Sequence, residues 1–172
     1  NFIMNDFFNS DKFSENFPEK KCKVITSIAM FYDLDNPNKF VEDVAKCLHR
    51  DGIWIIQMAY LIPMLKLNGF DNIGHEHLEY YSVKALKKLI EKHGMKIFNV
   101  EKNYVYGGSI RAYVTHKEND LIPISPSVKN IMQEEDNLGL DDMLIYNEFA
   151  DNVNKIKEKL YAFVTDQVNK GK

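Results

Sequence analysis

The stretch Val24-Ile25-Thr26-Ser27-Ile28-Ala29-Met30 decides the fold class. Its apolar and β-branched side chains follow one another with little polar alternation, which is typical of a strand buried on both faces of a parallel sheet. Asn36 and Pro37 then supply an N-cap and a first-turn proline, and apolar residues at helical spacing run from Phe40 to Leu48. A strand followed by a helix predicts an α/β protein with a mostly parallel sheet.

A second unit of the same kind follows. Residues 53–59 predict another buried strand, and Ser82 caps a helix that Gly94 ends as a left-handed residue. Residues 96–101 and 109–115 alternate apolar and polar side chains on either side of a glycine pair, which predicts a closing antiparallel hairpin.

The two ends of the chain differ from this pattern. The apolar run at residues 2–4 predicts the end of a further strand. Composition shifts after residue 117, where charged residues and two prolines appear, so we expect a boundary there. Beyond it, residues 140–169 carry apolar side chains in a three-four repeat, which predicts a long helix that needs a partner surface.

Composition narrows the function. The chain has 172 residues, is 45% hydrophobic and carries a net charge of −3, so nothing indicates a nucleic-acid or membrane surface. Cys22 and Cys47 lack metal-site spacing, and we expect reduced thiols in a cytoplasmic protein. The chain begins at Asn1 rather than Met, so we expect an upstream segment.

The residues most able to move a proton near neutral pH lie at 69–82, on a predicted loop. This segment holds His75 and His77 with several acids and tyrosines. A histidine side chain has an ordinary pKa of about 6.5, which suits a general base. A metal-dependent hydrolase is a minor alternative because His-x-His can present two imidazoles to zinc. It lacks an evident third ligand, and Glu79 stands where the helical zinc-protease motif needs its second histidine.

Two motifs together resemble a known family. His-Glu-His-Leu-Glu-Tyr-Tyr-Ser at 75–82, followed by Gly-Gly-Ser-Ile-Arg at 107–111, is similar to the S-adenosylmethionine-dependent sugar C-methyltransferases, which have the class I methyltransferase fold. The resemblance implies the second half of a Rossmann-like sheet over residues 1–117. It also implies that residues 118–172 are a helical segment leading to a further domain. The glycine-rich cofactor loop of the family is absent, so we expect an internal fragment.

The resemblance assigns roles in methylating a keto-deoxysugar nucleotide. His77 removes the proton beside the ketone, Glu76 orients an imidazole or the sugar, and His75 helps to hold the ketone. Gly74 stands where many members have a tyrosine. The substrate contacts that we carry forward are Tyr60, Tyr80, Ser109 and Arg111.

The same resemblance places S-adenosylmethionine after two strands. Asp6 and Phe7 would meet the adenine, while Ala29, Met30 and Phe31 would run along the cofactor. The alternative for these residues is plain structure, with Asp6 as a turn acid and Phe31 in the core.

A non-catalytic role is the rival interpretation. The chain would then be an interaction module whose exposed sheet edge and C-terminal helix pair with a partner or with a second copy. A homodimer is the candidate assembly in either case.

Overall fold

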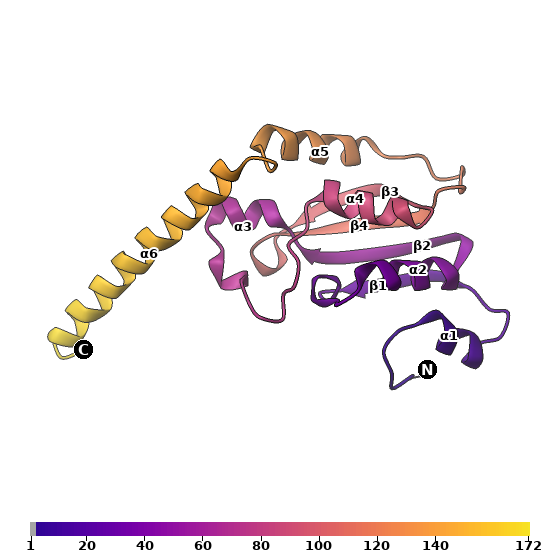
Figure 1. The fold of residues 1–172 in the computed structure, drawn as a ribbon, viewed down its shortest axis with the longest axis horizontal. Helices are drawn as coiled ribbons and strands as arrows, with labels where there is room; N and C mark the ends of the chain where they lie inside the picture. Colours follow the sequence, from indigo (N-terminus) through magenta and orange to yellow (C-terminus); the bar gives the residue numbers. More distant parts are fainter. Residues whose placement is uncertain (1–2) are drawn as a thin grey trace.

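The computed structural model describes residues 3–172, in which strands and helices alternate along the chain (Figure 1). The strands are β1 (Cys22–Ile28), β2 (Leu48–Ala59), β3 (Met95–Asn103) and β4 (Ser109–His116). The α-helices are α1 (Ser10–Asn16), α2 (Pro37–Cys47), α3 (Leu61–Leu67), α4 (Val83–Lys92), α5 (Pro126–Leu138) and α6 (Met143–Asn169). Short 3-10 helices are η1 (Phe31–Asp33), η2 (Phe70–Asn72) and η3 (Val105–Gly107).

The described strands form one sheet in the order β1-β2-β4-β3. β1 pairs with β2 in parallel, and β4 is antiparallel to both of its neighbours. The α/β class and the closing hairpin are therefore confirmed. The mostly parallel sheet is confirmed too, because β1, β2 and β3 run in the same direction, with helical crossovers through α2 and α4, and β4 alone is reversed.

Local signals set the helix ends as expected. The Asn36 side chain accepts a hydrogen bond from the amide of Lys39 at 3.0 Å, and Ser82 Oγ accepts from the amide of Ala85 at 3.1 Å. Gly94 has a φ of 71°, the left-handed conformation that ends α4 at little steric cost for glycine.

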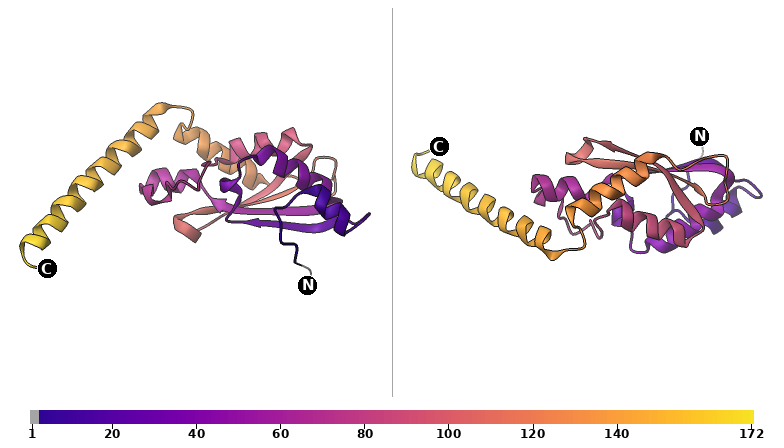
Figure 2. Two further views of the ribbon diagram at one scale, coloured as in Figure 1. Left: turned by 60° about the horizontal axis from the view of Figure 1, so that its bottom comes forward. Right: turned by 90° about the horizontal axis from the view of Figure 1, so that it is seen from above.

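Helices α2, α4 and α5 lie together on one side of the sheet (Figure 2). The β2 side chains of Trp54, Ile56 and Met58 point to this side and are completely or almost completely buried. On the opposite face of β1, Val24 and Ile28 remain 58% and 51% exposed. The hydrophobic core thus lies between one face of the sheet and its three helices.

A buried carboxylate joins α5 to this core. Glu135 is 1% exposed and accepts hydrogen bonds from the Tyr60 hydroxyl at 2.8 Å and from the amides of Val83 and Lys84 at 2.5 and 2.9 Å. Those amides are the first two of α4, where a helix has unpaired donors and a positive dipole end. Burial and the adjacent Glu135 charge raise the pKa of Tyr60, so its hydroxyl stays protonated as the donor.

Two predictions about helices need adjustment. Pro126 is the first residue of α5, a helix that we had not predicted, and Ser125 is its N-cap. Gly139, with a φ of 72°, ends α5. The long helix then starts at Met143 rather than at residue 140, because Asp142 caps it by accepting from the amide of Leu144 at 2.9 Å. Helix α6 extends away from the sheet (Figures 1 and 2).

The predicted strand at residues 2–4 is wrong where it can be judged. Phe2 lies outside the described residues, and Ile3 and Met4 are not in a strand. Ile3 is 89% exposed, and β1, the nearest strand along the chain, pairs with β2 only. A strand needs a neighbour to satisfy its backbone groups, and this apolar run has none among the described residues.

Replacing Glu135 by Ala should lower the free energy of unfolding by about 2–4 kcal/mol, because three buried or partly buried donors lose their acceptor. Urea unfolding followed by circular dichroism measures this change. Glu134→Ala is the matched control, since Glu134 is exposed and pairs only with Lys102, and it should cost less than about 1 kcal/mol. Equal losses in the two variants would contradict the role given to Glu135.

Candidate active site

A cleft lies at the carboxyl end of β2. Four segments form its walls: the turn after β1, the start of α3, the histidine loop and the turn before β4. The lining residues are Tyr32, Ala59, Tyr60, Leu61, Met64, Asn72, His77, Glu79, Tyr80, Gly107 and Gly108. Ligands in α/β sheets bind outside the carboxyl ends of the strands, and this cleft has that position.

Backbone hydrogen bonds hold the histidine loop in place. The carbonyl of Tyr32 accepts from the amides of Leu78 and Glu79 at 3.0 and 3.2 Å. The carbonyl of Tyr81 accepts from the amide of Leu61 at 3.2 Å. The loop is therefore attached both to the turn after β1 and to the start of α3.

His77 is the loop histidine that lines the cleft. Its Nδ1 lies 2.7 Å from the carbonyl oxygen of Asn72. Because a carbonyl only accepts, Nδ1 carries the proton, and Nε2 of the neutral ring is the acceptor. The rings of Tyr32 and Tyr80 pack edge-on against the imidazole, with centroids 4.6 and 6.5 Å away.

His75 and Glu76 are not brought into the cleft. The His75 side chain is 99% exposed, and its Nδ1 lies 3.0 Å from Glu76 Oε2. A Cβ at Gly74 would meet the flexible end of the Glu76 side chain at 3.1 Å, so the first carbon of a larger side chain would require that end to shift. The structure thus places His77 apart from the other two residues of its motif.

The two predicted tyrosines have different environments. The Tyr60 hydroxyl is directed to Glu135 in the core, so Tyr60 contributes its ring and backbone to the cleft wall. The Tyr80 hydroxyl donates to the Asn72 carbonyl at 3.2 Å, the same oxygen that holds His77.

Ser109 and Arg111 do not line the cleft. Ser109 is buried, and its hydroxyl donates to the carbonyl of Val105 at 2.7 Å. The Arg111 guanidinium donates to Gln57 Oε1 at 3.1 and 2.7 Å, across the β2–β4 pairing. Of this second motif, the glycine pair reaches the cleft.

The expected cofactor residues form two groups. Asp6 and Phe7 are exposed, and Asp6 pairs with Lys12. Ala29 follows β1 with a φ of 52°, and its amide donates to the carbonyl of Gln57 at 2.8 Å. Phe31 is fully buried between aromatic rings, so its side chain belongs to the core.

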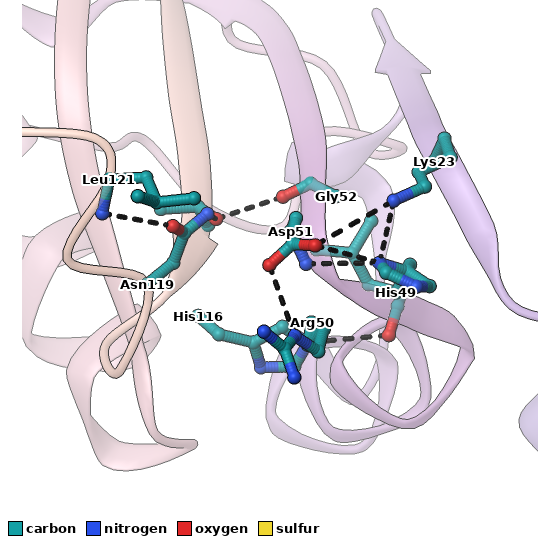
Figure 3. A network of polar contacts seen from close by, with 10 residues as sticks. Lys23, His49, Arg50, Asp51, Gly52, His116, Asn119 and Leu121 are labelled. Atoms are coloured by element: carbon teal, nitrogen blue, oxygen red, sulfur yellow. Dashed lines mark hydrogen bonds and ion pairs between the residues drawn. The ribbon is translucent and has the colours of Figure 1, made fainter.

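Polar contacts join the strands at the opposite end of the sheet (Figure 3). The buried Thr115 hydroxyl donates to the carbonyl of Gly52 at 2.8 Å and accepts from Asn119 Nδ2 at 3.0 Å. His49 Nδ1 accepts from the amide of Asp51 at 3.1 Å, beside Lys23. These bonds tie the strands together beside an open groove whose lining includes Arg50 and His116. We place the candidate chemistry at the cleft end because the histidine loop lies there.

Residues 3–172 contain no cluster of three or more histidine, cysteine, aspartate or glutamate side chains that could hold a metal ion. None of the helices in this range combines the length and apolar character that a membrane crossing needs.

Sequence matches identify the family. A methyltransferase-domain model matches residues 1–100, and a model of the C-methyltransferase C-terminal domain matches residues 104–172. The chain belongs to the methyltransferase family. That family has the class I, Rossmann-like fold and uses S-adenosylmethionine as methyl donor.

Individual relatives agree with this assignment. The chain is 31% identical to the C-methyltransferase NovU of Streptomyces niveus over 142 residues. The matched region covers 83% of this chain and 34% of that protein. It therefore spans about a third of that relative's length.

Solved structures match more distantly. The LepI complex with S-adenosylmethionine has a TM-score of 0.48 at 9% identity, over 58% of this chain and 27% of that one. A methyltransferase of Clostridium acetobutylicum has a TM-score of 0.45 at 12% identity, over 57% and 59%.

Several residues of the site were not predicted from the sequence. Glu79 lines the cleft, Asn72 acts through its backbone carbonyl, and Tyr32 is an aromatic residue that we considered for a sugar pocket but did not carry forward. Glu79 lies two residues after His77, and that proximity was the available signal. Backbone acceptors such as Asn72 leave no signature in residue type.

Replacing Gly108 by Ala should disturb the cleft wall and lower the free energy of unfolding by about 2–4 kcal/mol. Gly108 has a φ of 127°, and a Cβ there would lie 2.4 Å from Cβ of Pro63 in α3. Gly107→Ala is the control, because its φ of 77° is strained but no heavy atom lies within 4 Å of the added Cβ. Chemical denaturation of both variants measures the difference, and a Gly108→Ala loss no larger than that of the control would contradict the contact with α3.

Proposed function

We propose that the protein containing this chain transfers a methyl group from S-adenosylmethionine to a carbon atom of a keto-deoxysugar nucleotide. The observation that carries this proposal is the hydrogen bond from His77 Nδ1 to the Asn72 carbonyl. It makes Nε2 the basic atom of a histidine that lines the cleft at the carboxyl end of β2. Methylation of the carbon beside a ketone requires a base of this kind, whereas a non-catalytic interaction module needs none.

The chemistry needs one proton removed and one carbon–carbon bond formed. Nε2 of His77 takes the proton from the carbon beside the ketone, and the electron pair of that C–H bond passes to the enolate. The donor supplies a methyl group on a sulfonium, which leaves as the neutral thioether when the enolate carbon takes the methyl. The Asn72 carbonyl then stabilises the imidazolium, since it already accepts the Nδ1 proton.

The residues after β1 fit a donor in this position. Ala29 adopts a left-handed φ, which for a residue with a side chain is strained and is found most often at functional turns. The turn continues into Tyr32, whose carbonyl holds the histidine loop and whose ring packs on His77. A donor bound along Ala29 and Met30 would therefore lie beside the base.

Two further observations support the substrate class and setting. The rings of Tyr32 and Tyr80 line the cleft and offer flat surfaces of the kind that pack against sugars. Cys22 and Cys47 are both free thiols, as in proteins of the reducing cytoplasm, where we place this protein.

Replacing His77 by Ala in the full-length protein should lower kcat by about 10²–10⁴-fold, the usual contribution of a general base. Binding of S-adenosylhomocysteine should be unchanged, because the imidazole acts on the acceptor. Radiolabelled methyl transfer to a panel of nucleoside-diphosphate keto-deoxysugars measures the first quantity, and calorimetry measures the second.

The control is His93→Ala, since His93 follows α4 and contacts Asn38 at 3.0 Å. It should leave turnover unchanged. A His77→Ala protein that keeps wild-type turnover, or a wild-type protein that methylates no member of the panel, would refute the proposed function.

A second candidate function, self-association, is favoured by helix α6. No residue of this helix is buried, and its last turns expose large apolar side chains at Leu160, Tyr161, Phe163, Val164 and Val168. A second copy of the chain could bury this surface in a homodimer, which would also serve an enzyme.

The double variant Leu160→Gln and Phe163→Gln should convert a dimer to a monomer in sedimentation velocity. Exposed apolar surface on a helix favours association, and two amides weaken it. The matched control exchanges two polar residues on the same helix, Asn152→Gln and Asn154→Gln. A wild-type chain that sediments as a monomer at all concentrations would exclude this function.

A further inference from the structure

We propose that Glu79, rather than Glu76, is the carboxylate that binds the acceptor, by accepting a hydrogen bond from a hydroxyl group of the sugar. This inference rests on the proposed methyl transfer at His77 and names the recognition group of the same cleft.

Glu79 lies in the wall of the cleft, close in the chain to His77. Among the described residues that line the cleft, Glu79 is the one with a carboxylate, and His77 is the one with a basic side chain. Glu76 does not line it, since its side chain is 60% exposed and is engaged with His75 on the outer side of the loop. A sugar held next to His77 therefore meets Glu79 and not Glu76.

Hydrogen bonds hold both the backbone and the side chain of Glu79 in place. The amide of Glu79 donates to the Tyr32 carbonyl at 3.2 Å, which fixes its backbone. The Tyr81 hydroxyl donates to Oε2, which fixes its carboxylate. Tyr81 itself is immobile because it is 7% exposed and its ring lies 5.4 Å from that of Phe31 in the core. A binding group held from both ends loses little entropy when a ligand arrives.

The donor supplied by Tyr81 is permanent. Burial and the hydrogen bond to Glu79 both raise the pKa of Tyr81, so the phenol stays protonated. One carboxylate oxygen is thereby occupied, and the other is available as an acceptor on a residue that lines the cleft. An ionised carboxylate accepts hydrogen bonds strongly from hydroxyl groups, which a sugar carries. It has no proton to donate to a ketone oxygen.

Other roles for Glu79 fit the structure less well. It is not the group that orients His77, because Nδ1 of that ring is already bonded to the Asn72 carbonyl. A role in attracting the donor's sulfonium would require Glu79 to face the donor, whereas the contact between Glu79 and the turn expected to hold the donor is a backbone hydrogen bond to the Tyr32 carbonyl.

The test compares Glu79→Gln with the wild type in the full-length protein. The probe is the nucleoside-diphosphate keto-deoxysugar of the panel that the wild type methylates fastest. Loss of the charged acceptor should raise KM for this sugar by about 10- to 100-fold, with kcat changed by less than about threefold. Binding of S-adenosylmethionine should be unchanged.

Two companion variants make the result specific. Tyr81→Phe keeps the buried ring but removes the anchor, and it should raise KM by a smaller factor, about 3- to 10-fold. Glu91→Gln removes a surface charge on α4, where Glu91 pairs with Lys87, and should leave both constants unchanged. Folding of each variant is verified by its thermal unfolding midpoint.

Several outcomes would overturn the inference. An unchanged KM in Glu79→Gln removes the sugar contact, and a fall in kcat alone makes Glu79 part of the proton transfer. Weaker binding of S-adenosylmethionine with normal binding of S-adenosylhomocysteine assigns Glu79 to the sulfonium. In each of these cases an inactive His77→Ala variant leaves the proposed function intact, whereas an active one refutes it independently.

Discussion

The buried carboxylate of Glu135 is the interaction on which the rest of the structure depends. A charge without water is stable only when donors surround it, and here the Tyr60 hydroxyl and two α4 amides do so. Tyr60 follows β2 directly, and its amide donates to the Gly108 carbonyl at 3.2 Å. Two of the four walls of the cleft, the start of α3 and the turn before β4, are therefore linked through Tyr60 to the carboxylate that α5 places in the core.

The polar side chains at the two ends of the sheet have different roles. At one end, Thr115 hydrogen-bonds to Asn119 and to the carbonyl of Gly52, so these two side chains hold strands together. At the other end, His77 Nδ1 and one carboxylate oxygen of Glu79 are hydrogen-bonded, and among residues 3–172 no hydrogen bond to His77 Nε2 or to the second carboxylate oxygen is seen. Unused capacity of that kind, in a rigid frame, is what a binding site requires.

Local signals allowed much of the fold to be predicted, because caps and glycine conformations depend on neighbours in the chain. Asn36, Ser82 and Gly94 act as expected, and so does the hairpin. Helix α5 was missed because Pro126 was interpreted as a break, although a proline also opens helices. The three bonds of Glu135 reach back more than fifty residues, and no local pattern shows them.

The site divides in the same way. His77 could be placed in a loop near the strand ends from residue type and motif, and the structure puts it in the cleft. The directions of Tyr60, Ser109 and Arg111 could not, because each depends on a partner in another element, namely Glu135, Val105 and Gln57.

The Tyr32 carbonyl gives the cleft a further property. It accepts hydrogen bonds from the amides of Leu78 and Glu79, while the Tyr32 ring packs on His77. A movement of the turn after β1 would therefore move the histidine loop with it. The same turn contains Ala29 and Met30, where the donor is expected to bind. A donor that displaces this turn must therefore displace the base and the Glu79 carboxylate in the same direction. Under the proposed function, such a linkage would keep the distance between the reacting carbon and the methyl group within the narrow range that transfer requires.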